Sequence, residues 1–147
     1  MITNREIATK LTEVAALLEM QGVAFKPRAY EKAALSIEAL DREAAEMYIE
    51  GGLKAVEEIA GVGKGIAGHI EEMVKTGSFK EYRDLKKKVP VDISQLLAIE
   101  GVGPKMIAVL WEKLHIKNLA QLERAANLGK VRDLANFGIK SEQKILH

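Results

Sequence analysis

Apolar side chains recur every three to four residues along most of the chain, the spacing that places them on one face of an α-helix. The first such stretch opens with a capping box, Thr3 and Glu6, and closes at Gly22. Its apolar face consists of Ile7, Leu11, Val14 and Leu18. The pattern therefore predicts a helix between Thr3 and Gly22.

A second helix is predicted to begin at Pro27, because proline is favourable in a first turn. Its apolar face consists of Tyr30, Ala33, Ala34, Ile37 and Leu40. Asp41 is a candidate N-cap for a third helix over 42–52, and a short segment, 53–61, then leads into a glycine-rich stretch. No segment alternates apolar and polar residues with period two, so the predicted fold class is all-α, with short helices and tight turns.

The chain is expected to divide into two small helical modules, residues 1–85 and 90–147. The segment between them contains the run Lys86–Lys88 and then Pro90, which ends a helix nearby. The simplest interpretation of the lysine run is a solvated helix C-terminus, which the helix dipole favours.

A glycine-containing turn between two helices is repeated in the sequence. Gly61 and Gly63 in "LKAVEEIAGVGKGIAGHIEEMV" correspond to Gly101 and Gly103 in "ISQLLAIEGVGPKMIAVLWEKL". A fainter third copy occurs in "VRDLANFGIKSEQKIL", where Asn136, Phe137 and Gly138 take the equivalent positions. A repeated supersecondary unit is strong evidence for architecture.

The two glycines of each turn have different predicted roles. The first turns the chain with a positive φ, and the second opens a helix N-terminus to which a ligand can come close. The apolar residue between them, Val62 or Val102, is expected to point inward. Exposed amides and the helix dipole then form an anion site, which Lys64 and Lys105 supplement. The natural ligand is a nucleic-acid phosphate, bound without reading sequence.

Two other interpretations of the glycine turns are open. Glycine turns can serve helix packing only, but the repetition favours phosphate binding. A nucleotide-binding loop is disfavoured, because no strand precedes the turn and no Gly-Lys-Ser/Thr follows it.

The composition of the chain excludes several classes of protein and of binding site. Hydrophobic residues make up 48% of the 147 residues, which excludes a disordered tail. The absence of cysteine excludes disulfides and thiolate zinc sites and fits a reducing cytoplasm. His69, His115 and His147 lack metal-ligand spacing, and no apolar run approaches the length of a membrane span. The net charge of +1 means that any DNA contact must come from placed groups rather than bulk charge.

The glycine turns are helix-hairpin-helix motifs. Their order, with Phe-Lys-x-Arg-Ala-Tyr at 25–30 and Gly-Val-Gly-Lys at 61–64, closely resembles the N-terminal part of bacterial family X DNA polymerases, relatives of eukaryotic DNA polymerase beta. The resemblance covers essentially all 147 residues. It implies a lyase-type domain over residues 1–85, which binds the 5′-phosphate side of a gap, and a DNA-binding subdomain over 90–147, which holds the primer side.

The resemblance also implies site residues and partners. The DNA-binding residues would be Lys26, Gly61, Gly63, Lys64, Gly65 and His69 in the first module, and Gly101, Gly103, Lys105 and Met106 in the second. Na⁺ or K⁺ would be held by the carbonyls of Glu57, Ile59 and Val62 and of Leu97, Ile99 and Val102. The partner would be gapped or primer-template DNA, bound by a monomer in the bacterial cytoplasm, at the nucleoid, with no membrane association.

The catalytic parts of the family are not expected in this chain. The family's palm and phosphoesterase domains use Mg²⁺ or Mn²⁺, and neither fits in 147 residues without an Asp-x-Asp pair. We therefore expect a polymerase fragment, or a free-standing DNA-binding derivative.

His69 departs from the family pattern, because lyase domains carry there a lysine that forms a Schiff base with an abasic site. Imidazole cannot form that imine, so His69 is expected to hydrogen-bond near DNA or to pack at the helix surface. Lys26, Lys32 and Lys64 are other amines, but spacing singles out none of them. Phe25 is a candidate for base stacking. Tyr30 is assigned mainly to packing, and Tyr82 and Trp111 to the core or its rim.

Three functional hypotheses follow. The first is sequence-independent DNA binding at gaps and primer-template junctions, in a repair polymerase that acts in base excision repair. The second is residual 5′-deoxyribose-phosphate lyase activity. The third is a free-standing module that binds DNA or protein.

Overall fold

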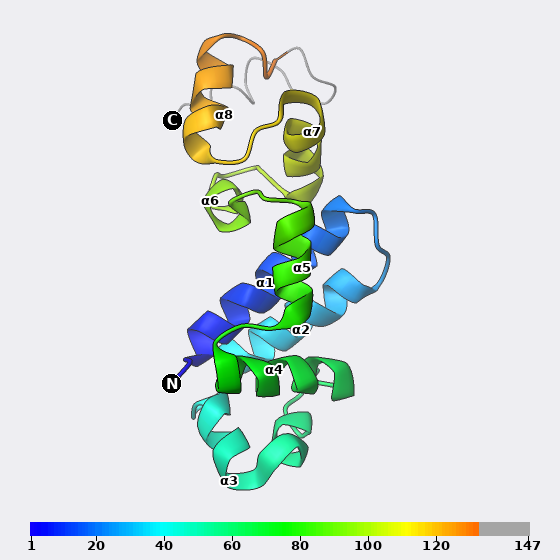
Figure 1. Ribbon diagram of the computed structural model, residues 1–147, viewed down its shortest axis with the longest axis vertical. Helices are drawn as coiled ribbons and strands as arrows, with labels where there is room; N and C mark the ends of the chain where they lie inside the picture. Colours follow the sequence, from blue (N-terminus) through cyan, green and yellow to red (C-terminus); the bar gives the residue numbers. More distant parts are fainter. Residues whose placement is uncertain (133–147) are drawn as a thin grey trace.

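A computed structural model describes residues 1–132, and this part of the chain is entirely helical apart from its turns (Figure 1). The predicted all-α fold class is therefore confirmed for these residues. The third glycine turn, at Asn136, Phe137 and Gly138, lies outside the described residues. The helices are α1 (Asn4–Met20), α2 (Lys26–Glu38), α3 (Ala44–Glu57), α4 (Lys64–Thr76), α5 (Lys80–Lys88), α6 (Ile93–Leu97), α7 (Pro104–Leu114) and α8 (Leu119–Asn127).

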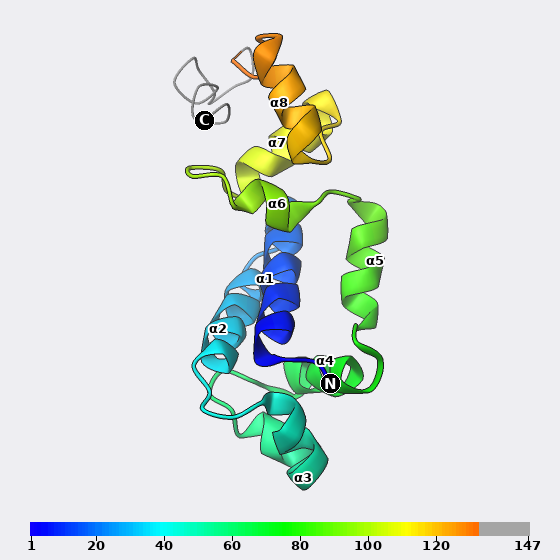
Figure 2. The same ribbon diagram turned by 90° about the vertical axis from the view of Figure 1, so that its left-hand side faces the viewer.

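Helices α1 and α2 lie side by side and form the middle of the molecule (Figures 1 and 2). The predicted cap of α1 is confirmed, since Thr3 Oγ1 accepts from the N–H of Glu6 at 3.2 Å. The chain leaves α1 through Gly22, whose φ is +77°. The predicted apolar faces of both helices are buried, except that Leu40 is only half-buried.

Helix α3 begins later than predicted, at Ala44, and Asp41 does not cap it. The cap comes instead from α1, where the Asn4 carbonyl Oδ1 accepts from the N–H of Ala44 at 2.7 Å. In return, Glu43 Oε2 accepts from the N–H of Asn4 at 2.6 Å. The helix kinks at Gly52, where φ is 70° and ψ is −161°, and continues to Glu57, beyond the predicted end at residue 52.

The molecule is elongated, with α3 and α4 at one end and α7 and α8 at the other (Figure 1). Helix α1 contacts α5, α6 and α7 as well as α2, so the buried residues form one cluster that runs between the ends. The predicted module boundary, residues 86–89, covers the last residues of α5 and Val89, shortly before α6 begins at Ile93. Within residues 1–132, no helix combines the length and the apolarity needed to cross a membrane.

Candidate nucleic-acid interface

The two glycine turns have the same backbone conformation. Gly61 has φ +78° and Gly101 has φ +82°, which confirms the predicted left-handed residue in each turn. The valine that follows each of them is buried, with 5% of Val62 and 8% of Val102 exposed. The predicted inward position of these valines is thus confirmed, and each valine fixes its turn to the core.

The second glycine of each turn is the N-cap of the next helix. Gly63 precedes α4 and Gly103 precedes α7, both in extended conformation, with φ −89° and −116°. No side chain caps either helix. Side chains accept from backbone amides at the starts of α1, α6 and α8, from Thr3, Asp92 and Asn118, whereas α2 and α5 also lack a side-chain cap. The first-turn amides of α4 and α7 therefore remain open to an external acceptor.

The two open N-termini differ in their donors. Helix α4 begins with Lys64 and Gly65, which both carry an N–H. Helix α7 begins with Pro104, which carries none, so its donors are the amides of Gly103, Lys105 and Met106. The side chains of Lys64 and Lys105 are exposed beside these amides.

Several glycines here have no role in the turn conformation itself. A Cβ at Gly63, Gly65, Gly68 or Gly103 would meet nothing within 4 Å, and none of these residues has a positive φ. Gly65 and Gly68 lie inside α4, where each costs about 1 kcal/mol relative to alanine. Neither the space around these glycines nor their φ therefore requires glycine, and the backbone there is open.

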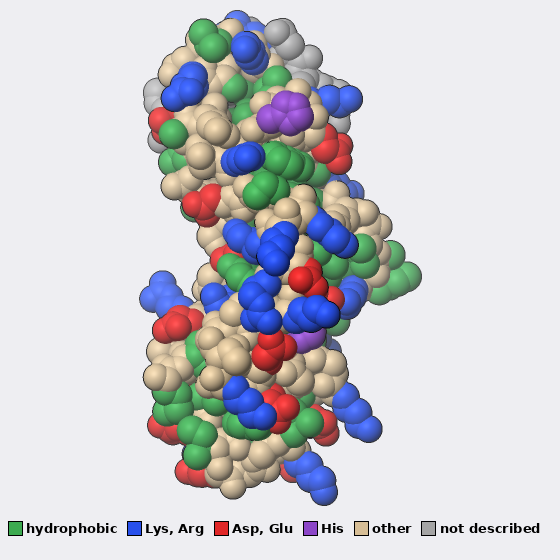
Figure 3. All heavy atoms as spheres, viewed as in Figure 1, with side chains coloured by type: hydrophobic (Ala, Val, Ile, Leu, Met, Phe, Trp, Pro, Cys, Tyr) green, Lys and Arg blue, Asp and Glu red, His purple; other side chains and the backbone are tan. Residues whose placement is uncertain are grey.

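A group of basic side chains lies on the side of the molecule opposite the second turn. Lys and Arg side chains gather over α5 in the middle of the molecule (Figure 3). The turn between α6 and α7 projects from the opposite side (Figure 2). Its attraction for an anion therefore depends on its own amides and on Lys105 rather than on α5.

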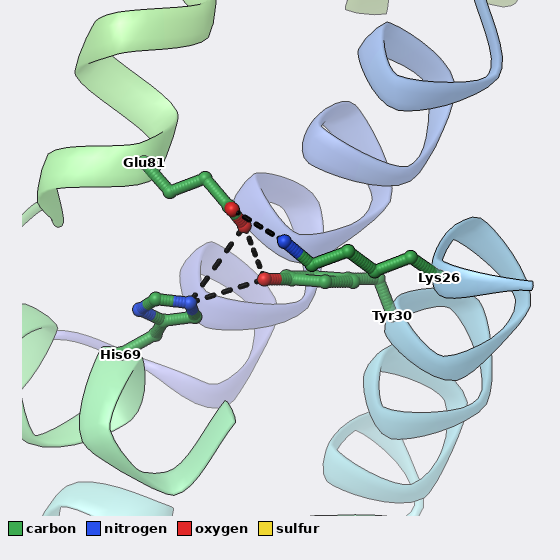
Figure 4. A network of polar contacts seen from close by, with 4 residues as sticks. All are labelled: Lys26, Tyr30, His69 and Glu81. Atoms are coloured by element: carbon green, nitrogen blue, oxygen red, sulfur yellow. Dashed lines mark hydrogen bonds and ion pairs between the residues drawn. The ribbon is translucent and has the colours of Figure 1, made fainter. Parts of the chain in front are cut away.

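A polar network from three helices surrounds His69 (Figure 4). His69 Nε2 lies 3.0 Å from the Tyr30 hydroxyl, which donates to Glu81. His69 Nε2 is also 3.7 Å from Glu81 Oε1, and Lys26 Nζ lies 2.7 Å from Glu81 Oε2. The network links α2, α4 and α5.

Burial and charge set the protonation states in this network. Burial lowers the pKa of His69 from its ordinary value, and the nearby Glu81 only partly opposes this. Burial works to raise the pKa of Glu81, but hydrogen bonds from Lys26 and Tyr30 outweigh it and leave that pKa lowered. Burial and the bond to Glu81 raise the pKa of Tyr30. The network therefore holds a carboxylate, a protonated tyrosine and a neutral histidine at pH 7.

His69 also packs against an aromatic ring. Its ring stacks on Phe79 at a centroid distance of 4.6 Å, and 26% of its side chain is exposed. Packing was one of the two interpretations offered by the sequence. Neither Glu81 nor Phe79 was predicted as a neighbour. Tyr30 is buried, as predicted, while Lys26 contacts Glu81 rather than standing free for a phosphate.

Phe25 has two unusual features. It is 90% exposed, and its φ is +67°, a conformation that is strained for a bulky residue. It lines a surface groove together with Val23, Pro27 and Arg28. Tyr82 and Trp111 are half-buried at the rim of the core, as predicted.

Side chains of the described residues do not form a metal site. Among residues 1–132, no three His, Cys, Asp or Glu side chains come together in an arrangement that could hold a metal ion. The backbone carbonyls of the turns remain as candidate ligands for a monovalent cation.

The geometry of the turns agrees with comparisons to known proteins. Residues 2–79 match the family described as "Helix-hairpin-helix domain", which is more than half of the chain. The chain belongs to this family. Over 144 residues it is 35% identical to "DNA polymerase/3'-5' exonuclease PolX" of Bacillus subtilis (strain 168). The match covers 97% of this chain and 24% of the relative, so the chain spans about a quarter of the relative's length. The resemblance to family X DNA polymerases is thereby confirmed.

Proposed function

We propose that the chain binds DNA without regard to base sequence, through backbone phosphates at the N-termini of α4 and α7. The observation that carries this proposal is the pair of uncapped N-termini behind turns of matching conformation. The open space at Gly63 and Gly103 lets a phosphate oxygen come close to the amides. The similarity to a protein named as a DNA polymerase and exonuclease supports DNA as the ligand.

The resemblance to family X DNA polymerases supports separate roles for the two hairpins. The first hairpin, with the exposed Lys64, would bind the 5′-phosphate side of a gap, and the second would hold the primer side. A monomer would suffice, because both hairpins are in one chain. The chain would thus serve gap filling in repair, as part of a polymerase of the PolX type.

The salt dependence of duplex binding tests the proposal. Two hairpins and a few lysines indicate about five phosphate contacts, so log affinity should fall with log salt at a slope of roughly −4 to −5. Fluorescence anisotropy with two duplexes of unrelated sequence measures this slope. A slope near zero, or affinity that depends strongly on base sequence, would exclude phosphate binding and favour a protein-binding module.

Phe25 is proposed to stack on an unpaired base in a gap. Phe25→Gly should weaken binding to single-stranded and gapped DNA by about 1–3 kcal/mol, the usual value of a base–aromatic stack. The same change should raise the free energy of unfolding by about 1 kcal/mol, because glycine relieves the positive φ. Anisotropy and thermal unfolding measure the two effects. Equal affinity of the parent and the variant for gapped DNA would exclude stacking.

The turns are proposed to hold a monovalent cation that bridges to a DNA phosphate. The carbonyls are those of Glu57, Ile59 and Val62 and of Leu97, Ile99 and Val102. The Ile59 and Ile99 carbonyls each accept one turn hydrogen bond, at 3.0 and 3.1 Å, which leaves each a lone pair for a hard cation. Replacing K⁺ by tetramethylammonium at constant ionic strength should weaken duplex binding. Unchanged affinity would exclude the cation site.

A further inference from the structure

One carboxylate of α1 is buried although it lies off the apolar face that the sequence predicts for this helix. Glu13 is 9% exposed, between the buried residues Leu11 and Val14. Burying a carboxylate is costly unless donors surround it. Its environment therefore has to supply those donors.

Donors reach Glu13 from two other helices. The Tyr82 hydroxyl on α5 donates to Oε2 at 2.9 Å, and the Ser94 hydroxyl on α6 donates to Oε1 at 2.8 Å. Lys86 Nζ on α5 is 3.8 Å from Oε2. Burial and the bond to Glu13 raise the pKa of Tyr82 to about 12, so this hydroxyl stays protonated and remains a donor. Both oxygens of Glu13 are thus engaged.

The contacts of Glu13 cross from the first hairpin's part of the molecule to the second. Helix α6 is the first helix of the second hairpin, and α1 packs on α2 (Figure 2). Lys86 extends the link, because its Nζ also donates to the carbonyl of Val91 at 3.1 Å, in the segment between α5 and α6. The carboxylate therefore joins α1, α5, α6 and the connecting segment at one point.

Apolar packing alone would not fix this arrangement. Hydrophobic contact is non-directional, so it specifies the orientation of α6 and α7 on α1 less sharply than hydrogen bonds do. Hydrogen bonds to a buried carboxylate have fixed length and direction, and a buried polar group can select one arrangement among several.

We propose that Glu13 is a positioning residue that holds the second hairpin at one set orientation to the first, so that both N-termini engage a single DNA molecule together. The DNA-binding half of this statement rests on the function proposed above. The structural half, the set orientation of the two hairpins, does not depend on that function. Both hairpins are in one chain, so binding by the second is intramolecular once the first is bound. A fixed geometry that places both at the DNA raises the effective concentration of the second hairpin and therefore the overall affinity.

A distance measurement tests the structural half without DNA. The chain contains no cysteine, so Lys75→Cys on α4 and Lys113→Cys on α7 give two unique sites for spin labels. Pulsed electron paramagnetic resonance should give one narrow distance distribution for this labelled parent. Two changes should broaden this distance distribution while helical circular dichroism persists. The first is Glu13→Leu, which replaces the carboxylate by an apolar side chain of similar size. The second is the pair Tyr82→Phe with Ser94→Ala, which removes both hydroxyl donors.

Tyr48→Phe is the matched control. The Tyr48 hydroxyl donates to Glu71 Oε2 at 2.8 Å, so this change also removes a half-buried Tyr–Glu bond, but one that joins only α3 and α4. Its distance distribution should equal that of the parent. A narrow, unshifted distribution in both Glu13→Leu and the double variant would overturn the positioning role.

DNA binding then tests the functional half. With a duplex long enough to reach both hairpins, Glu13→Leu should lose about tenfold in affinity. With a duplex too short to reach both, it should bind as the parent does. Equal losses on both duplexes would contradict coupling of the hairpins. If the parent bound neither duplex, the proposed function would fail, and the distance distributions would still decide the role of Glu13.

Discussion

Gly103→Asp should lower affinity for duplex DNA by roughly 10- to 100-fold and leave the melting temperature unchanged or slightly higher. Aspartate is a preferred N-cap residue, and the extended conformation of Gly103, φ −116° and ψ 177°, suits it. Its carboxylate would accept from the open amides of Lys105 or Met106. It would thereby take the place of the phosphate and also repel it. Hydrogen bonds to a charged group contribute about 1.5–3 kcal/mol, which sets the expected loss.

The opposite effects on stability and binding make this prediction specific. A variant that merely damaged the fold would lose both together. Asn118→Asp is the matched control, because it adds the same charge at the start of α8, a helix that its own Asn118 side chain already caps. Its DNA affinity should stay near that of the parent.

Gly63→Asp extends the test to the first hairpin. It should weaken recognition of a 5′-phosphorylated gap more than recognition of plain duplex, whereas Gly103→Asp should do the reverse. Anisotropy with the two substrates measures the contrast. If both variants lose both substrates equally, the proposed division between the hairpins is wrong.

The chain should be a poor abasic-site lyase, with little covalent trapping by borohydride on a 5′-deoxyribose-phosphate substrate. The Schiff base needs a neutral primary amine, whose nitrogen attacks the C1′ aldehyde with loss of water. His69 has no such amine, and the ammonium of Lys26 is held by Glu81 at 2.7 Å. Lys64 stands exposed at the first turn, where a bound phosphate would keep it charged.

Introducing a lysine at position 69 should give the Schiff-base adduct only in part. In His69→Lys the new amine would face Glu81, whose Oε1 lies 3.7 Å from the present imidazole nitrogen. A neighbouring carboxylate stabilises the ammonium form and raises its pKa. His69→Lys with Glu81→Gln should therefore trap much more than His69→Lys alone, and His69→Gln should not trap. Efficient trapping by the unmodified chain would overturn this account, and mapping the adduct would identify the lysine.

The features that the sequence could predict are those that depend on residues close together in the chain. The turns at Gly61 and Gly101 need a left-handed residue, and the repeat made both recognisable without a structure. The cap of α1 by Thr3 was equally predictable, because its partner is three residues away. In such cases, residue type and short spacing determine the conformation.

Contacts between residues that are far apart in the sequence could not be predicted in this way. Asp41 is a good N-cap by type, but Asn4, 40 residues before Ala44, takes the role. Glu81 bonds to a tyrosine 51 residues away, and Glu13 to a serine 81 residues away. A glutamate normally lies at the surface, so no pattern in α1 indicates that Glu13 is buried. Only the packing of α1 against α5 and α6 brings its donors together.

Backbone amide shifts on DNA titration test the central claim most directly. In ¹H–¹⁵N correlation spectra of the labelled chain, an unlabelled duplex should shift the amides at the two helix N-termini. These are Gly63, Lys64 and Gly65 before and in α4, and Gly103, Lys105 and Met106 before and in α7. Hydrogen bonds to phosphate should move them downfield, and the capped amides of Glu6 and Gln121 should stay in place. DNA binding that leaves the first set unmoved would contradict the account.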